Sequence, residues 1–345
     1  MSSITQLCNI VPAWSDVMNE AQWLEARQSG IGGSEIGAIA GLSKYESPYS
    51  IWARKVHNVN AFDGNEATDL GHLLEPSVAL AYAREFHAAV VEWPVILRSK
   101  VHTFLSANVD RFIVEPSDQF PAGEVTVWKS ETPPPGIICL LECKTGALAS
   151  PGSPSDWFTD VGIPMGYSCQ GYWYLAATGF DQIEYACLLG GHGMQYRTQY
   201  RDDDIIDDLL TIAERFWNDH VLTGVPPEVD GSNSTEDAQK ALYPQSVENK
   251  TVEGGAELAF LLAELKEAKA ATSAAEDYQK GVRAKIVDII GDAEIATVDG
   301  QVVATFKTGK EREFFADKIF KESHPDLYRE FLRPKPGVRT LRAKD

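Results

Sequence analysis

The chain has 345 residues and a net charge of −19, and 44% of its residues are hydrophobic, so we expect a packed globular protein of one or two domains. It shows no apolar run long enough to cross a bilayer, no signal-peptide pattern and only five scattered cysteines, which argues against a membrane protein, a zinc or iron–sulfur site and a disulfide framework, and favours the cytoplasm. The acidity weakens a nucleic-acid-binding function without excluding it, because metal ions held by carboxylates place positive charge where a phosphate would lie.

Residues 1–230 have the pattern of a mixed α/β domain. A helix is expected to open near Ser34, which would be its N-cap, and another is expected around 74–86, where apolar residues recur on one face. Strand-like apolar runs follow at 90–100, 101–115 and 136–146. The Pro-rich segment 116–135 between the last two runs is interpreted as a hairpin extension.

The rest of this domain should contain a helix at 168–179, a strand at 182–191 and a helix at 202–221. The first of these helices is expected to end at Gly179, since glycine adopts the left-handed conformation that terminates many helices. A stretch rich in Gly, Pro and Ser then predicts a linker, which we assign to residues 231–250.

Residues 251–345 are predicted to form a separate extension. Apolar residues from Leu258 to Ile289 recur mostly at intervals of three and four, which indicates one long amphipathic helix ending at Gly291. A β-hairpin with Asp299-Gly300 as its turn should follow. The chain ends in a basic tail, residues 332–345.

Two opposite charges stand one residue apart at the end of a core strand, in the run IICLLECKT. Residues i and i+2 of a strand share a face, so Glu142 and Lys144 should point the same way, with Cys143 buried behind them. Asp110 follows the earlier strand-like run FLSANV. If the two strands pair, Asp110 and Glu142 approach each other and share a divalent ion, and the main-chain carbonyl of Cys143 completes its shell.

These residue types suit phosphodiester hydrolysis. Carboxylate oxygens bind Mg²⁺ or Mn²⁺, which lowers the pKa of bound water and stabilises the leaving oxygen. A lysine beside the metal would orient or deprotonate the attacking water. A lone Glu-x-Lys pair is more often a surface salt bridge, but Asp110 upstream, flanked by strand patterns, favours the catalytic interpretation over that structural one.

The set Asp110, Glu142 and Lys144 resembles the core of the restriction-endonuclease-like PD-(D/E)xK nucleases. The ordered motifs of the first half are similar to those of the YqaJ-like viral recombinases, relatives of the phage lambda exonuclease: WLEARQSGIGGSEIGAIAGLSKY, GHLLEP, SANVDRF, LLECKT and SCQGYWYLAATG. This resemblance implies an α/β fold, a central mixed sheet flanked by helices. The chain departs from the family pattern at two places. These are Ala107-Asn108-Val109 and Arg111, and a glycine is common at the position of Arg111.

The resemblance assigns further residues one by one. Glu75 in GHLLEP matches a helix glutamate that completes the metal site, with an ordinary first-turn acid as the alternative. Gln170 matches a glutamine that contacts DNA or water near the site. Arg27 and Ser34 match the pair that binds the 5′-phosphate of a DNA end. An arginine such as Arg27 can donate two parallel hydrogen bonds to a phosphate. Without the resemblance, Ser34 would be only an N-cap and Arg27 would pair with a surface acid.

The function implied is a Mg²⁺-dependent exonuclease that degrades one strand of duplex DNA from its 5′ end, for phage-type homologous recombination. The family further implies a homotrimer and a single-strand-annealing partner protein. Alternatives are an endonuclease or Cas4-like nuclease of the same fold, and a non-catalytic protein that binds DNA ends. The lack of clustered cysteines disfavours a Cas4-like protein.

Overall fold

The computed structural model describes residues 4–14, 18–59, 66–146, 157, 162–190, 193–334, 337 and 339–343. The chain divides into two compact units, Met1–Tyr243 and Pro244–Asp345. No helix within the described ranges is both long and apolar enough to cross a membrane.

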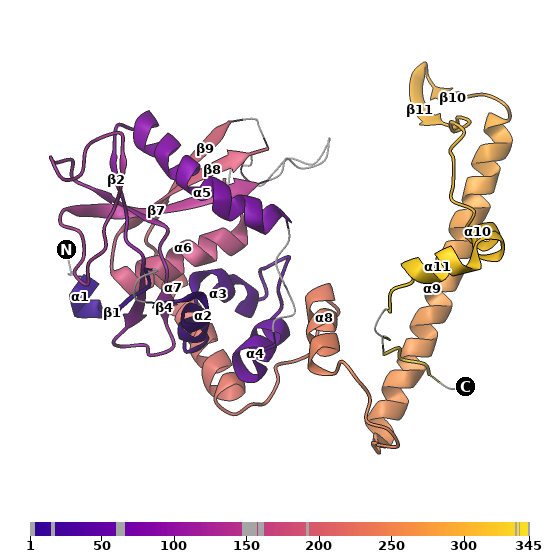
Figure 1. Cartoon of the computed structure of the whole chain (residues 1–345), viewed down its shortest axis with the longest axis horizontal. Helices are drawn as coiled ribbons and strands as arrows, with labels where there is room; N and C mark the ends of the chain where they lie inside the picture. Colours follow the sequence, from indigo (N-terminus) through magenta and orange to yellow (C-terminus); the bar gives the residue numbers. More distant parts are fainter. Residues whose placement is uncertain are drawn as a thin grey trace. The chain divides into compact units, whose positions relative to one another are not determined.

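A mixed sheet forms the centre of the first unit (Figure 1). Within the described residues it has six strands in the order β6-β2-β5-β7-β8-β9. The strand β7 pairs antiparallel with β5 and parallel with β8, which places it in the middle of the sheet. The strands of this sheet are β2 (Ala89–Glu92), β5 (Arg111–Val114), β6 (Val125–Val127), β7 (Ile137–Gly146), β8 (Gln182–Leu189) and β9 (Met194–Tyr200). A smaller sheet has the order β1-β3-β4, from Cys8–Pro12, Val95–Ser99 and Ser106–Ala107.

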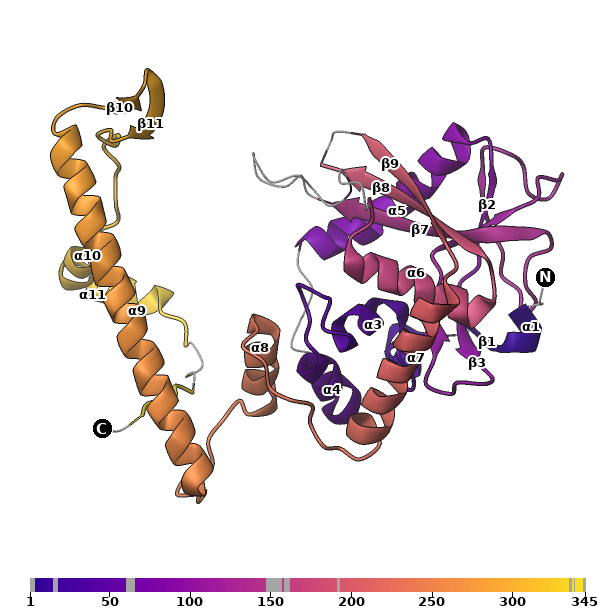
Figure 2. The same ribbon diagram turned by 180° about the vertical axis from the view of Figure 1, so that it is seen from behind.

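Helices cover both faces of the central sheet (Figures 1 and 2). One face packs on α5, whose Val78 and Ala83 join Leu141 and Cys143 of β7 in a buried cluster. The opposite face packs on α6, and Leu140 of β7 belongs to a second buried cluster on that side. Alternate residues of β7 therefore face different helices. The helices are α1 (Ile4–Leu7), α2 (Glu20–Gln28), α3 (Gly33–Ile39), α4 (Pro48–His57), α5 (Glu66–Glu85), α6 (Met165–Thr178), α7 (Asp203–Phe216) with a π-helical turn (Trp217–Val221), and α8 (Asn233–Leu242).

Several local expectations are confirmed. The helix α6 ends at Gly179, which is left-handed with φ of 74°. In the second unit, the long helix α9 (Gly255–Ile290) ends at Gly291. The predicted hairpin is β10 (Ile295–Val298) and β11 (Gln301–Thr305), and the positive φ angles of Asp299 and Gly300 form its turn. The helices α10 (Asp317–Ser323) and α11 (Pro325–Phe331) follow. The predicted fold class, α/β with a flanked central mixed sheet, a long helix and a hairpin, is confirmed.

Two local expectations are wrong, and a third has the wrong starting residue. Ser34 is not the N-cap of α3: Gly32 is, and Ser34 is the second helical residue. Segment 116–135 does not form a hairpin extension, because its strand β6 pairs parallel with β2 and so extends the central sheet. The helix expected around 74–86 begins earlier, at Glu66, and continues through Pro76.

The second unit differs from the first in burial. Within its described residues, none is buried, and apolar side chains of α9 such as Leu258, Leu261 and Ile289 are exposed. The helix α8 lies inside the range predicted as a linker and belongs to the first unit, where the Thr235 hydroxyl lies 2.7 Å from that of Ser47 at the start of α4.

Candidate active site

Asp110 lies where β5 begins beside β7. The last register pair between these strands joins Arg111 to Leu141, so β7 continues past the end of its neighbour. There the Cys143 N–H donates to Asp110 Oδ2 at 2.9 Å. The N–H and C=O of one strand residue point to the same edge, so the Cys143 carbonyl also faces the side of Asp110. One acidic residue and one carbonyl are thus brought to one strand end.

Glu142 is buried at the centre of this site. Its side chain faces α6, in line with the alternation of β7, and is 1% exposed. Its Oε1 accepts from Lys144 Nζ at 2.6 Å and from Gln170 Nε2 at 2.5 Å. Its Oε2 is buried and has no hydrogen-bond partner among the described residues. A buried carboxylate oxygen without a donor is costly, which indicates that a cation or water belongs there.

The charges of this cluster perturb one another. Burial and the neighbouring Asp110 carboxylate raise the pKa of Glu142 to about 8. Burial alone would lower the pKa of Lys144, but the charges of Glu142 and Asp110 outweigh it and raise that pKa. The Lys144 ammonium also lies 4.9 Å from the centre of the Tyr167 ring. Lys144 is therefore held as a cation against Glu142.

Gln170 and Tyr174 lie one turn apart on the inner face of α6. Gln170 is 6% exposed, so its side chain is buried within the site. Its amide donates to both Glu142 and the Tyr174 hydroxyl, which in turn donates to the Asn108 carbonyl at 2.7 Å. This chain of bonds ties Glu142 to the segment before Asp110. Tyr174 was not among the predicted site residues; its i, i+4 spacing from Gln170 was the available signal.

Arg111 occupies the other side of Asp110. This buried arginine contacts Glu75 Oε1 at 2.7 Å, the Asp110 carbonyl at 2.6 Å and Glu92 Oε2 at 3.3 Å. Burial and the Asp110 charge raise the pKa of Glu75, and Arg111 opposes that rise. The sequence marked Arg111 only as a departure from the family pattern; the structure places it among carboxylates. Sequence reasoning missed Glu92, which no local motif marks.

Two carboxylates of this site are candidate ligands for a divalent cation. In the part of the chain that the structure describes, no three His, Cys, Asp or Glu side chains stand gathered as a metal site. Asp110 and Glu142 nevertheless fit a hard cation, because both are carboxylates and Glu142 has a buried oxygen without a donor. Glu75 is held by Arg111 and would have to turn toward them.

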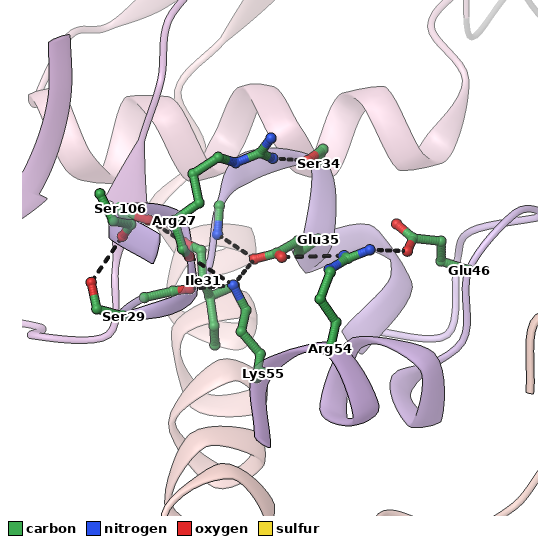
Figure 3. A network of polar contacts seen from close by, with 12 residues as sticks. Arg27, Ser29, Ile31, Ser34, Glu35, Glu46, Arg54, Lys55 and Ser106 are labelled. Atoms are coloured by element: carbon green, nitrogen blue, oxygen red, sulfur yellow. Dashed lines mark hydrogen bonds and ion pairs between the residues drawn. The ribbon is translucent and has the colours of Figure 1, made fainter. Parts of the chain in front are cut away.

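The residues predicted to grip a phosphate meet at a second point. Arg27, at the end of α2, donates from Nη2 to the Ser34 hydroxyl at 3.3 Å (Figure 3). The Arg27 guanidinium also lies 4.6 Å from the centre of the Trp23 ring. Ser34 is exposed. The preceding residue, Gly33, packs so closely on α6 that a Cβ there would overlap the Tyr174 ring. The Arg27–Ser34 pair therefore adjoins the helix that carries Gln170.

Comparison with known proteins places the chain among relatives. Residues 22–181 match the family model of the YqaJ-like viral recombinase domain. The uncharacterized protein YqaJ of Bacillus subtilis (strain 168) is 30% identical over 321 residues, which are 92% of each chain.

Two of the solved structures similar to this chain are those of exonucleases. One is an alkaline exonuclease (LHK-Exo) from Laribacter hongkongensis, with 16% identity and a TM-score of 0.42 over 59% of this chain and 94% of that one. The other is a phage related exonuclease from Haemophilus somnus 129PT, with 16% identity and a TM-score of 0.39 over 59% and 99%. The match to YqaJ over nearly the whole chain, together with the family-model match, shows that this protein belongs to the YqaJ-like viral recombinase family.

Proposed function

We propose that the protein is a Mg²⁺-dependent exonuclease that degrades one strand of duplex DNA, in the 5′-to-3′ direction. The observation that carries the proposal is the cluster of half-buried Asp110 and Lys144 around buried Glu142 and Gln170, in which one Glu142 oxygen has no donor among the described residues. Membership of a viral recombinase family supports a role in making single-stranded overhangs for phage-type recombination.

Asp110, Glu142 and the Cys143 carbonyl would hold the metal, joined by Glu75 once it leaves Arg111. When bound, Mg²⁺ (or Mn²⁺) supplies a nucleophilic water and neutralises charge on the phosphate. Lys144, kept protonated by its acidic neighbours, donates a hydrogen bond to orient the attacking water. Gln170 holds the Glu142 carboxylate in place from α6.

The proposed partners are double-stranded DNA ends and a single-strand-annealing protein, with a homotrimer as the assembly and the cytoplasm as the compartment.

Exonuclease action itself is tested with two plasmids of the same sequence, one linear and one covalently closed. We expect the linear DNA to be degraded and the closed circle to stay intact. Cutting of the closed circle would assign the protein as an endonuclease instead.

Proton competition should make metal binding depend on pH. Because the pKa of Glu142 is raised to about 8, the carboxyl is largely protonated below that pH, and a cation must displace its proton. We expect the affinity for Mg²⁺ to rise by at most about tenfold per pH unit up to this pKa and then to level off. Calorimetric titration in buffers of different ionisation enthalpy measures both affinity and proton release. A flat affinity between about pH 6 and 8 would refute the proposed ligand.

Arg27→Ala should remove a preference for 5′-phosphorylated ends. A terminal phosphate carries more charge than an internal one, and a charge-assisted contact from Arg27 is worth about 10- to 150-fold in rate. The measurement compares initial rates on 5′-phosphate and 5′-hydroxyl duplexes for wild type and variant. Arg201→Ala is a control, because Arg201 also donates to a main-chain carbonyl near the end of a helix, that of Leu175 on α6 at 2.7 Å, and is not part of the Arg27–Ser34 pair. If Arg27→Ala keeps the preference, Arg27 does not anchor the end.

A further inference from the structure

A buried ionic network underlies the Arg27–Ser34 pair (Figure 3). Glu35, the third residue of α3, is buried, and its Oε2 accepts from the Gly32 N–H at 2.8 Å. The same oxygen lies 2.8 Å from Lys55 Nζ, and Oε1 lies 3.2 Å from Arg54 Nη2. Both cations come from α4. The start of α3 is therefore fixed to α4 through a single carboxylate.

Lys55 also holds the other side of the pair. Its ammonium donates to the Arg27 carbonyl at 2.9 Å and to the Gly30 carbonyl at 2.6 Å. The side chain is only 2% exposed, and with Glu35 these two carbonyls occupy the three hydrogens of the ammonium. One buried cation thus joins the end of α2, which carries Arg27, to the start of α3, which carries Ser34.

The charges of the network balance, with two acids and two cations. Arg54 is shared between Glu35 and a second acid, Glu46, which it contacts at 2.6 Å. Buried ion pairs add little net stability over apolar packing, so stability alone does not account for Lys55. Lys55 instead positions the main chain, because its three bonds hold the segments on both sides of Gly32.

We propose that Lys55 is a positioning residue for the DNA-end phosphate: by bonding the Arg27 and Gly30 carbonyls and Glu35 together, it aligns the Arg27 guanidinium with the Ser34 hydroxyl. This inference rests on the proposed end recognition by Arg27 and Ser34. Lys55 itself is buried and does not touch the DNA. Its removal should therefore weaken discrimination between phosphorylated and unphosphorylated ends, acting through Arg27.

The test uses the full-length protein and blunt duplexes carrying a 5′-phosphate or a 5′-hydroxyl. Binding is measured by fluorescence anisotropy in EDTA, and hydrolysis is measured separately in Mg²⁺. Lys55→Met should bring a wild-type affinity ratio of about 10- to 150-fold down to about twofold or less. Lys100→Met is the matched control, since exposed Lys100 also donates to a main-chain carbonyl, that of Thr5, and should keep the wild-type ratio.

Removing Lys55 alone leaves a buried carboxylate with one cation fewer, which risks unfolding. The variant Lys55→Met/Glu35→Gln removes both charges together, and it is used if the single variant melts early. Lys55→Met is also made in the Arg27→Ala background. Because Lys55 acts through Arg27, it should cause no further loss of discrimination there.

The outcomes distinguish the positioning role of Lys55 from the anchoring role of Arg27, on which it rests. A folded Lys55 variant that retains the wild-type ratio overturns the inference and leaves the Arg27 anchor standing. A further loss of discrimination in the Arg27→Ala background also overturns it. A wild-type protein without any phosphate preference overturns the anchor, and the role of Lys55 with it.

Discussion

Glu142→Gln is expected to lower the rate of DNA hydrolysis by about three decades or more while the protein stays folded. The substitution keeps the volume of the side chain, and its amide oxygen still accepts from Lys144 and Gln170. It removes the negative charge and the second carboxylate oxygen, which is buried without a donor and would meet the metal. Rates on a linear duplex and a melting curve are the measurements.

Glu184→Gln is the matched control for this prediction. Glu184 is a partly buried glutamate on the neighbouring strand β8, paired in register with Leu141, and it accepts from the Thr198 hydroxyl rather than from site residues. Its loss should leave the rate within about twofold of wild type, as for substitutions outside a site. Near-normal activity of Glu142→Gln would refute the assignment of the site.

Lys144→Met should reduce kcat by about two to four decades and change the affinity for DNA far less. The Met side chain keeps the apolar stem beside Tyr167 but cannot orient a water or balance Glu142. Single-turnover rates at saturating protein separate chemistry from binding, and anisotropy in EDTA gives the affinity.

Equal losses in rate and in affinity would make Lys144 a phosphate clamp instead. Because the substitution leaves Glu142 buried without its cation, the melting temperature is measured alongside. A Lys144→Arg variant keeps the charge. If it restores affinity but not rate, the precise placement of the ammonium is what the reaction needs.

Local sequence patterns predicted the features that depend on residues close together in the chain. Alternation along β7 placed Glu142 and Lys144 on one face, and they bond at 2.6 Å. Gly179 and the Asp299-Gly300 turn were found because glycine tolerates positive φ, and a turn of this kind needs it. These features depend on neighbours in the chain, so a single sequence reveals them.

Features that depend on distant residues were not predicted. Arg111 binds Glu75, 36 residues earlier, and Lys55 bonds the Gly30 carbonyl, 25 residues earlier. Neither contact leaves a local pattern, because each is set by how elements pack. The wrong N-cap has a different, local cause: Ser34 is a favourable cap by type, but Glu35 bonds the Gly32 N–H three residues earlier and fixes the helix start there.

The most direct test of the central claim is digestion of a linear duplex labelled at one 5′ end or one 3′ end, in Mg²⁺ and in EDTA. Wild-type protein in Mg²⁺ should release the 5′ label first, as short products, while the 3′ label stays on long strands. EDTA and Glu142→Gln should each stop the release. Cleavage that persists in EDTA, or intact DNA in Mg²⁺ and Mn²⁺ alike, would contradict a metal-dependent nuclease built on Asp110 and Glu142.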